Sequence, residues 1–223
     1  MSVAFRFATD NYLHKESMGG TLKTLAMVLL LAVTAFAQNT TQSDPASSAQ
    51  GKQPSANALV ADLASQVPAP KPEDVKTMDG LLRAIYDVIS GPAGDRDWDR
   101  FRSLCVPQAR FTATRNAPDG SVAVITWGVD DFVATYRDVF KGGSFYENAI
   151  VNRAQTFGSV TQVFSSYESR NTPSEKPYQR GINSIQLIND GKRWWVHSIL
   201  WDEERPGNPL PPEYAYSSAG KEQ

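Results

Sequence analysis

Hydrophobic residues recur every three or four positions in three parts of the chain, and this spacing predicts three helices. The first predicted helix ends at Gly91-Pro92. The second spans 97–104 with Asp97 at its start, and the third spans 129–140 and stops at Gly142-Gly143. The buried stripe of the first helix consists of Leu81, Leu82, Ile85, Tyr86 and Ile89.

Segments rich in β-branched and aromatic residues lie between and after these helices and predict strands. Asp119-Gly120 and Asp190-Gly191 predict tight hairpin turns, because an Asp-Gly step supplies the positive φ that such turns require. The resulting order of two helices, two strands, one helix and four strands predicts an α+β domain, a strongly curved antiparallel sheet wrapped over three helices. The predicted strands are 109–114, 122–127, 149–157, 160–170, 181–188 and 194–202.

The last predicted strand holds three of the chain's five tryptophans and the only histidine after residue 37. Residues two apart in a strand share a face. One face then consists of Trp195, His197, Ile199 and Trp201, and the other of Trp194, Val196 and Leu200. The second of these faces is apolar enough to predict a covered surface, most simply the interface of a homodimer.

The first 37 residues predict a secretory signal. Lys23 precedes the apolar run 25–33, and Ala35-Phe36-Ala37 offers a small-x-small cleavage site before Gln38. The run is shorter than the ~20 residues that cross a bilayer, so we expect a secreted or periplasmic protein with no membrane attachment after cleavage. Met18 is an alternative start, and an uncleaved anchor is the alternative interpretation.

Composition divides the remaining chain into three parts. Residues 38–75 are rich in Ala, Ser, Gln and Pro and predict a flexible leader. Residues 76–204 hold the predicted helices and strands and form the domain. Residues 205–223 begin with a proline-rich stretch and predict an extended tail.

Charge and cysteine content exclude several classes of function. The net charge is −2, and it becomes −3 when the three basic and two acidic residues of the signal are removed, so no basic field is available for nucleic acid. Cys105 is the one cysteine and predicts a small buried hydrophobe. Asp130-Asp131 suits a helix start better than a metal site, and we expect neither metal nor cofactor.

The element order resembles the nuclear-transport-factor-2-like (NTF2-like) superfamily, especially its SnoaL-like branch of small bacterial proteins. The resemblance rests on 97–111, on Asp119-Gly120 with Trp127-Gly128, and on the Gly191 hairpin ending at 201–203. It implies a cone-shaped, cystatin-like barrel. Because the superfamily includes isomerases, dehydratases, epoxide hydrolases, cyclases and dimeric binding modules, the fold alone does not name the function.

The ketosteroid isomerases of this superfamily use an aspartate base, with a tyrosine and a protonated aspartic acid that stabilise the oxyanion. The position of the base falls at Ala113, and the second carboxyl falls at Asn183 or Ser184. The tyrosine falls at Ile85 or Tyr86. Since both carboxyl groups are missing, steroid-isomerase chemistry is not expected.

The resemblance also implies a pocket wall, because 200–202 is similar to the Tyr-Trp-Ser that ends those isomerases, where the tryptophan lines the ligand cavity. Alternation along the strand then adds three residues to the wall beside Trp201. They are Trp195, His197 and Ile199. Further candidates for ligand contact are Tyr86, Trp98 and Trp127. One of Tyr167 and Glu168 faces the pocket, and the sequence does not decide which.

Three functions stay open, and the sequence does not decide whether the protein is an enzyme. The preferred one is binding of a small apolar or aromatic molecule. The second is a non-catalytic dimeric interaction module of the cell envelope, whose leader and tail contact a partner. The third is weak isomerase, lyase or hydrolase activity with His197 as general base, against which stands the simpler role of a packed strand residue.

Overall fold

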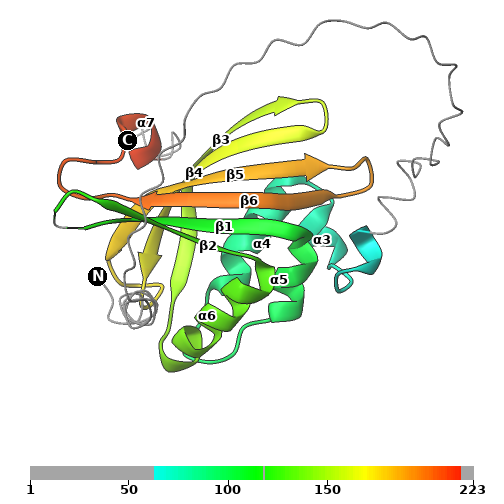
Figure 1. Cartoon of the computed structure of the whole chain (residues 1–223), viewed down its shortest axis with the longest axis horizontal. Coiled ribbons are helices and arrows are strands. Elements are labelled where there is room, and N and C mark those ends of the chain that lie inside the picture. The colour runs from blue at the N-terminus through cyan, green and yellow to red at the C-terminus, as the bar shows by residue number, and fades with distance from the viewer. Residues whose placement is uncertain (1–62, 118, 217–223) are drawn as a thin grey trace, which may run out of the picture.

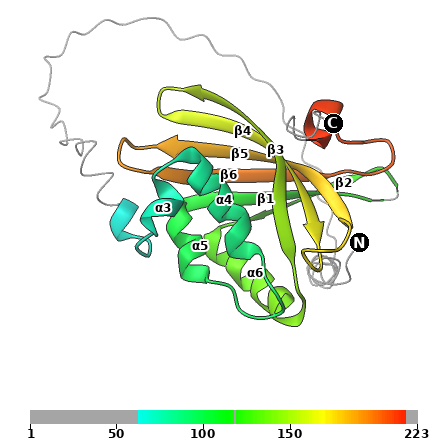
Figure 2. The same cartoon turned by 180° about the vertical axis from the view of Figure 1, so that it is seen from behind.

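The computed structural model describes residues 63–117 and 119–216, so the predicted signal and residues 38–62 of the leader lie outside the described residues. Helices α4, α5 and α6 lie together on one face of a six-stranded sheet (Figures 1 and 2). The predicted α+β class and curved sheet are therefore confirmed. Within these residues no helix is both long and apolar enough to span a membrane.

The three main helices form where the spacing of apolar residues predicts them. They are α4 (Met78–Ile89), α5 (Trp98–Leu104) and α6 (Val129–Gly142). Thr77 caps α4, since its Oγ1 accepts a hydrogen bond of 3.0 Å from the amide of Gly80. Asp97 caps α5 in the same way through the amide of Arg100, at 2.9 Å. Both caps satisfy amides that a helix start leaves without a partner.

The strands form one open sheet in the order β2-β1-β6-β5-β4-β3. Four neighbouring pairs are antiparallel, but β1 and β6 run parallel, so the prediction of an antiparallel sheet is wrong at this pair. A parallel pair needs a long crossover, and here α6 and four strands intervene. The sheet curves without closing. The strands are β1 (Cys105–Asn116), β2 (Val122–Trp127), β3 (Tyr146–Phe157), β4 (Val160–Arg170), β5 (Gln179–Asn189) and β6 (Trp194–Glu203).

The predicted hairpin between β5 and β6 is confirmed. Gly191 has φ +83°, the conformation that favours glycine. Asn189 Oδ1 accepts a hydrogen bond from the Gly191 amide, and Asp190 Oδ1 accepts from the amides of Lys192 and Arg193, each at 2.8 Å. The side chains of the turn therefore hold its backbone and align the two strands.

The alternation of faces along β6 breaks at His197. Gln186 of β5 pairs with Ser198, whereas the next residue, Leu187, pairs with Val196, so His197 is the extra residue of a β-bulge. Val196 is buried and His197 is exposed. The predicted faces of both residues are wrong, because an extra residue shifts the alternation by one position.

The folded domain begins before residue 76. Leu63 and Val67 pack against the core, and α3 (Pro72–Val75) buries Asp74 and Val75. Residues 63–75 are therefore part of the domain, which corrects the prediction that the whole leader is flexible.

Arg100 of α5 forms hydrogen bonds with residues of both α3 and α4. Its guanidinium donates two hydrogen bonds to Asp74, at 2.7 and 2.9 Å, and a third to Asp87 of α4. Asp74 is only 5% exposed. The hydrogen bond from Arg100 outweighs the effect of burial and holds the pKa of Asp74 below its ordinary value.

The chain after β6 lies across the outer face of the sheet, opposite the helices, and carries α7 (Pro212–Ala215) (Figure 1). Ser166 Oγ donates a hydrogen bond of 2.7 Å to the carbonyl of Tyr214. The guanidinium of Arg153 lies 5.4 Å from the centre of the Tyr214 ring. Residues 205–216 are therefore a strap fastened to β3 and β4 rather than a free tail.

Candidate functional site

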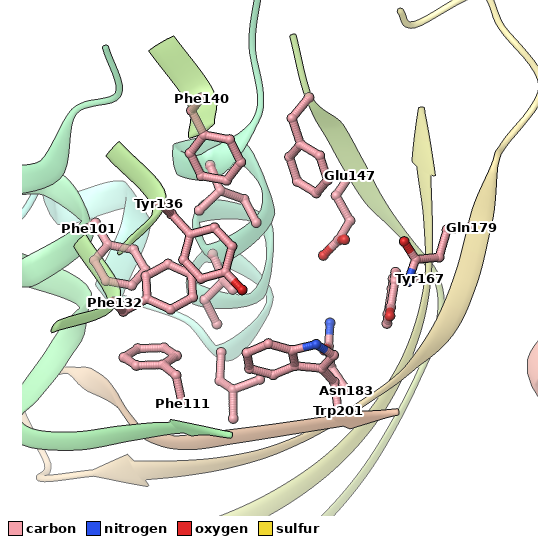
Figure 3. Close-up of a pocket in the computed structure, with 14 residues that line it drawn as sticks. Phe101, Phe111, Phe132, Tyr136, Phe140, Glu147, Tyr167, Gln179, Asn183 and Trp201 are labelled. Carbon is pink, nitrogen blue, oxygen red and sulfur yellow. The ribbon is translucent and has the colours of Figure 1, made fainter. Parts of the chain in front are cut away.

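A cavity of about 70 Å³ lies between the helices and the concave face of the sheet. Helices α4, α5 and α6 supply one wall, and all strands but β2 supply the other. Figure 3 shows aromatic rings around the open space and the carboxylate of Glu147 pointing into it. The rings that dominate the wall belong to Phe101, Phe111, Phe132, Tyr136, Phe140 and Trp201.

The rings around Phe132 pack into one continuous cluster. The ring centre of Phe132 lies 5.2 Å from that of Phe101, 4.9 Å from that of Phe111 and 4.5 Å from that of Tyr136. Such pairs stabilise a fold by about 0.5–1.5 kcal/mol each beyond the burial of their area. The wall is therefore a fixed surface that an apolar ligand can contact without first ordering it.

Glu147 is the one carboxyl among the described residues that line this cavity. Ser169 Oγ donates a hydrogen bond of 2.8 Å to its Oε2. Burial raises the pKa of Glu147 to about 7, although the polar side chains of Ser169 and Asn183 act in the opposite direction. Near neutral pH the group therefore exchanges its proton readily, as a general acid or base must.

The backbone of Glu147 is fastened to the end of α4. Its amide donates to Ser90 Oγ at 2.9 Å, and the same hydroxyl donates to the carbonyl of Tyr86 at 2.7 Å. Two backbone hydrogen bonds join Gly91 and Phe145. The carboxyl is thus positioned by a helix end and a strand, which hold a functional group more rigidly than a loop does.

A hydrogen-bonded chain runs from Asn183, beside Glu147, into the sheet. Asn183 Nδ2 donates to the hydroxyl of Tyr86 at 3.1 Å, and that hydroxyl shares a hydrogen bond of 2.5 Å with Ser165 Oγ. Burial raises the pKa of Tyr86, so its hydroxyl stays protonated at neutral pH. Tyr86, predicted as a ligand contact, therefore lies behind the cavity and holds Asn183 in the wall.

The other residues expected at the pocket take two positions. Ile199 and Trp201 line the cavity itself. Trp127 stacks behind Trp201, with ring centres 6.0 Å apart and planes 9° apart, and Trp98 stacks behind Phe140 at 6.0 Å. Trp98 and Trp127 thus support the wall from its second layer.

Trp195 and His197, both expected in the wall, lie elsewhere. Trp195 Nε1 donates a hydrogen bond of 2.7 Å to Asp190, and the guanidinium of Arg193 lies 3.6 Å from the centre of the Trp195 ring. Trp195 therefore packs against the turn between β5 and β6. His197 borders a groove on the outer face with Phe157. The bulge carries its imidazole away from the cavity, where it cannot act on a molecule bound inside.

Sequence reasoning misses Glu147 because it starts the strand at 149, whereas β3 starts at Tyr146. The alternation of Phe145, Glu147 and Ala149 is the signal that would reveal it. The question between Tyr167 and Glu168 is settled by the sheet, since Tyr167 lines the cavity and Glu168 forms an ion pair with Arg170.

No group of three or more His, Cys, Asp or Glu side chains that could hold a metal ion occurs in the part of the chain that the structure describes.

Gly181 gives Tyr167 its place at the cavity. A Cβ at this position would lie 2.6 Å from the Tyr167 hydroxyl and 2.4 Å from the carbonyl of Asp202. Gly181→Ala is expected to displace the Tyr167 ring and to lower the free energy of unfolding by about 1–3 kcal/mol, as overpacking does. Thermal and urea denaturation measure the loss. The control is Gly142→Ala, where a Cβ meets nothing within 4 Å; equal losses in both variants would contradict the prediction.

The sequence matches no protein-family model and no curated protein. Several solved structures, however, are similar to it. A Nostoc punctiforme protein of unknown function with a cystatin-like fold has 10% identity and a TM-score of 0.45, over 60% of this chain and 92% of that one. A Silicibacter pomeroyi NTF2-like protein of unknown function has 9% identity and a TM-score of 0.40, over 58% and 94%.

A Streptomyces avermitilis protein described as a provisional dehydratase of the NTF2-like family has 10% identity and a TM-score of 0.44, over 60% of this chain and 97% of that one. The chain is similar to NTF2-like proteins. The resemblance predicted from the sequence is thus found again among solved structures, whereas the descriptions of these three do not name the SnoaL-like branch. At these identities and TM-scores the similarities assign no activity, so the cavity has to indicate the function.

Proposed function

We propose that the domain binds a small, largely apolar molecule in the cavity, with one polar group of that molecule at Glu147. The observation that carries this proposal is the combination of aromatic walls with a single carboxyl whose pKa lies near 7. Ligand sites combine an apolar lining with few, well-placed polar groups.

The carboxyl distinguishes this cavity from an imperfectly packed core. Burying an ionisable group among aromatic rings destabilises a fold unless something compensates. Here Ser169 holds the carboxyl, Asn183 favours its charged form and Ser90 holds its backbone, so the position is supported on several sides. A strongly shifted pKa inside a cavity is typical of functional sites.

The interaction-module alternative predicts a filled interior, and the open cavity favours ligand binding over it. Native mass spectrometry of the protein from its own host tests the choice. We expect an added mass that is lost on denaturation and is absent from Trp201→Ala. Trp194→Ala is the matched control, because Trp194 is on the same strand but is not a lining residue. The same added mass in all three proteins, or no added mass in any of them, would contradict the proposal.

Proton transfer by Glu147 to or from the bound molecule is a second candidate function. The pKa of about 7 favours it, since a general acid or base works best when its pKa is near the working pH. The role that the sequence suggests for His197 would then belong to Glu147. Turnover of a ligand identified by mass spectrometry should disappear in Glu147→Gln.

We also propose that the protein is exported and that two copies associate through the outer face of the sheet. Val124, Phe164 and Leu200 share this face and are 66%, 43% and 46% exposed. Apolar exposure of this kind is typical of an interaction surface. The same native mass spectra report the number of copies, and Leu200→Glu should leave single chains.

A further inference from the structure

We infer that the ligand of the cavity is a small organic cation, an amine with a compact apolar body. The inference rests on the proposed function, because it names the chemical class of the molecule that the cavity binds. Two observations carry it: the carboxylate of the cavity has no protein counter-charge, and aromatic rings surround the space into which it points (Figure 3).

In the part of the chain that the structure describes, no lysine or arginine forms an ion pair with Glu147. The nearby arginines are engaged elsewhere, since Arg170 pairs with Glu168 and Arg115 with Glu203. An ionised carboxylate in an apolar setting is stabilised by a partner of opposite charge. The ammonium group of a ligand supplies that partner, whereas a carboxylate ligand would be repelled.

The aromatic rings favour the same class of ligand. The face of an aromatic ring carries partial negative charge and attracts a cation within about 6 Å of its centre. Tyr136, Phe140 and Trp201 border the space opposite Glu147 (Figure 3). A cation between these rings and the carboxylate would be attracted from both sides, and its alkyl groups would meet the apolar wall.

Four buried or half-buried tyrosines around Glu147 stay neutral at working pH. They are Tyr86 of α4, Tyr136 of α6, Tyr167 of β4 and Tyr178, which lies just before β5. Burial raises the pKa of each tyrosine, and the charge of Glu147 raises it further, while Arg115 acts in the opposite direction on Tyr136 and Tyr167. Near pH 7, therefore, Glu147 alone among these groups changes its charge.

Two pairs of molecules with nearly equal shapes test the preference for a cation. They are ethylamine with ethanol, and isopropylamine with isopropanol, which are small enough to test against a cavity of about 70 Å³. Isothermal titration calorimetry at pH 8, where Glu147 is mostly ionised and an alkylamine is protonated, should give at least about tenfold tighter binding of each amine. Glu147→Gln should remove that difference. Glu213→Gln should keep the difference in affinity. This substitution removes the same negative charge, but from an exposed residue on the strap.

A second readout is the proton that leaves the protein. At pH 7 about half of the Glu147 carboxyls hold a proton, so binding of a cation should release about half a proton per ligand. Titrations in phosphate and HEPES buffers, whose heats of ionisation differ, measure this release. It should vanish in Glu147→Gln and persist in Glu213→Gln.

The outcomes separate this inference from the proposal beneath it. Alcohols that bind as tightly as the amines, or amine binding without proton release, would overturn the inference and leave the proposed function standing. A protein that binds none of the four molecules would overturn both. An amine preference that survives in Glu147→Gln would also overturn the inference, because the charge of the cavity would then not be its cause.

Discussion

Replacement of Glu147 by glutamine is expected to stabilise the folded protein above pH 7 by roughly 2 kcal/mol. The folded state raises the pKa of this carboxyl from 4.5 to about 7. Between these values the folded protein holds a proton that the unfolded chain has released, so the stability of the wild type falls as the pH rises through this window. Glutamine keeps a neutral side chain of similar shape and avoids that loss.

Urea unfolding at pH 4, 6 and 8 checks this result. The two proteins should differ little at pH 4, where the wild-type carboxyl is protonated in both states, and the gap should grow towards pH 8. Glu213→Gln should show no such dependence, since Glu213 is exposed. A variant that is less stable than the wild type at pH 8 would mean that the ionised carboxylate stabilises the fold.

Replacement of Arg100 by methionine is expected to lower the free energy of unfolding by roughly 3 kcal/mol at pH 7, as when a buried ion pair loses one partner. The change would leave Asp74, which is 5% exposed, without the two hydrogen bonds that satisfy its carboxylate. Arg102→Met is the control. Arg102 pairs with Asp99 and Asp130, whose side chains are 80% and 82% exposed, and such pairs contribute about 0–1 kcal/mol.

The pH dependence identifies Asp74 as the cause. Its pKa is lowered in the folded state, so the pair with Arg100 stabilises the protein above the ordinary pKa of aspartate and stops doing so as the pH falls through the folded value. The gap between the wild type and Arg100→Met should therefore narrow below pH 4. The double variant with Asp74→Asn should recover part of the loss at pH 7; a double variant as unstable as the single one would assign the loss to Arg100 packing alone.

Local signals along the chain predict most of the fold. The helices follow from apolar spacing, and Asp97 marks the start of α5 through a hydrogen bond that spans three residues. The structure adds a cap of the same span at Thr77, which the prediction does not name. The final hairpin follows from Asn189 and Asp190, whose side chains bind amides no more than three residues away. Each of these features depends on neighbours in sequence, which a pattern of residues records.

The missed features depend on partners that are distant in sequence. The bulge at His197 exists only in the pairing of β6 with β5, and the parallel pair of β1 and β6 depends on how the whole chain crosses over. Glu147 faces the cavity because β3 is joined to α4 through Ser90, 57 residues away. The resemblance of 200–202 to the isomerases places Trp201, and Ile199 can be added to it because the strand keeps its alternation on that side of the bulge.

The strap allows two events to be observed separately by fluorescence. Tyr216 ends the described strap directly after α7 and is 73% exposed. Helix α7 lies on the outer side of the sheet (Figure 1), while the cavity lies on the helical side. A dye attached at position 216 would therefore be shielded from solvent when another molecule covers that surface. Occupation of the cavity would instead alter the intrinsic emission of Trp201, so the two signals would belong to different faces of one thin sheet.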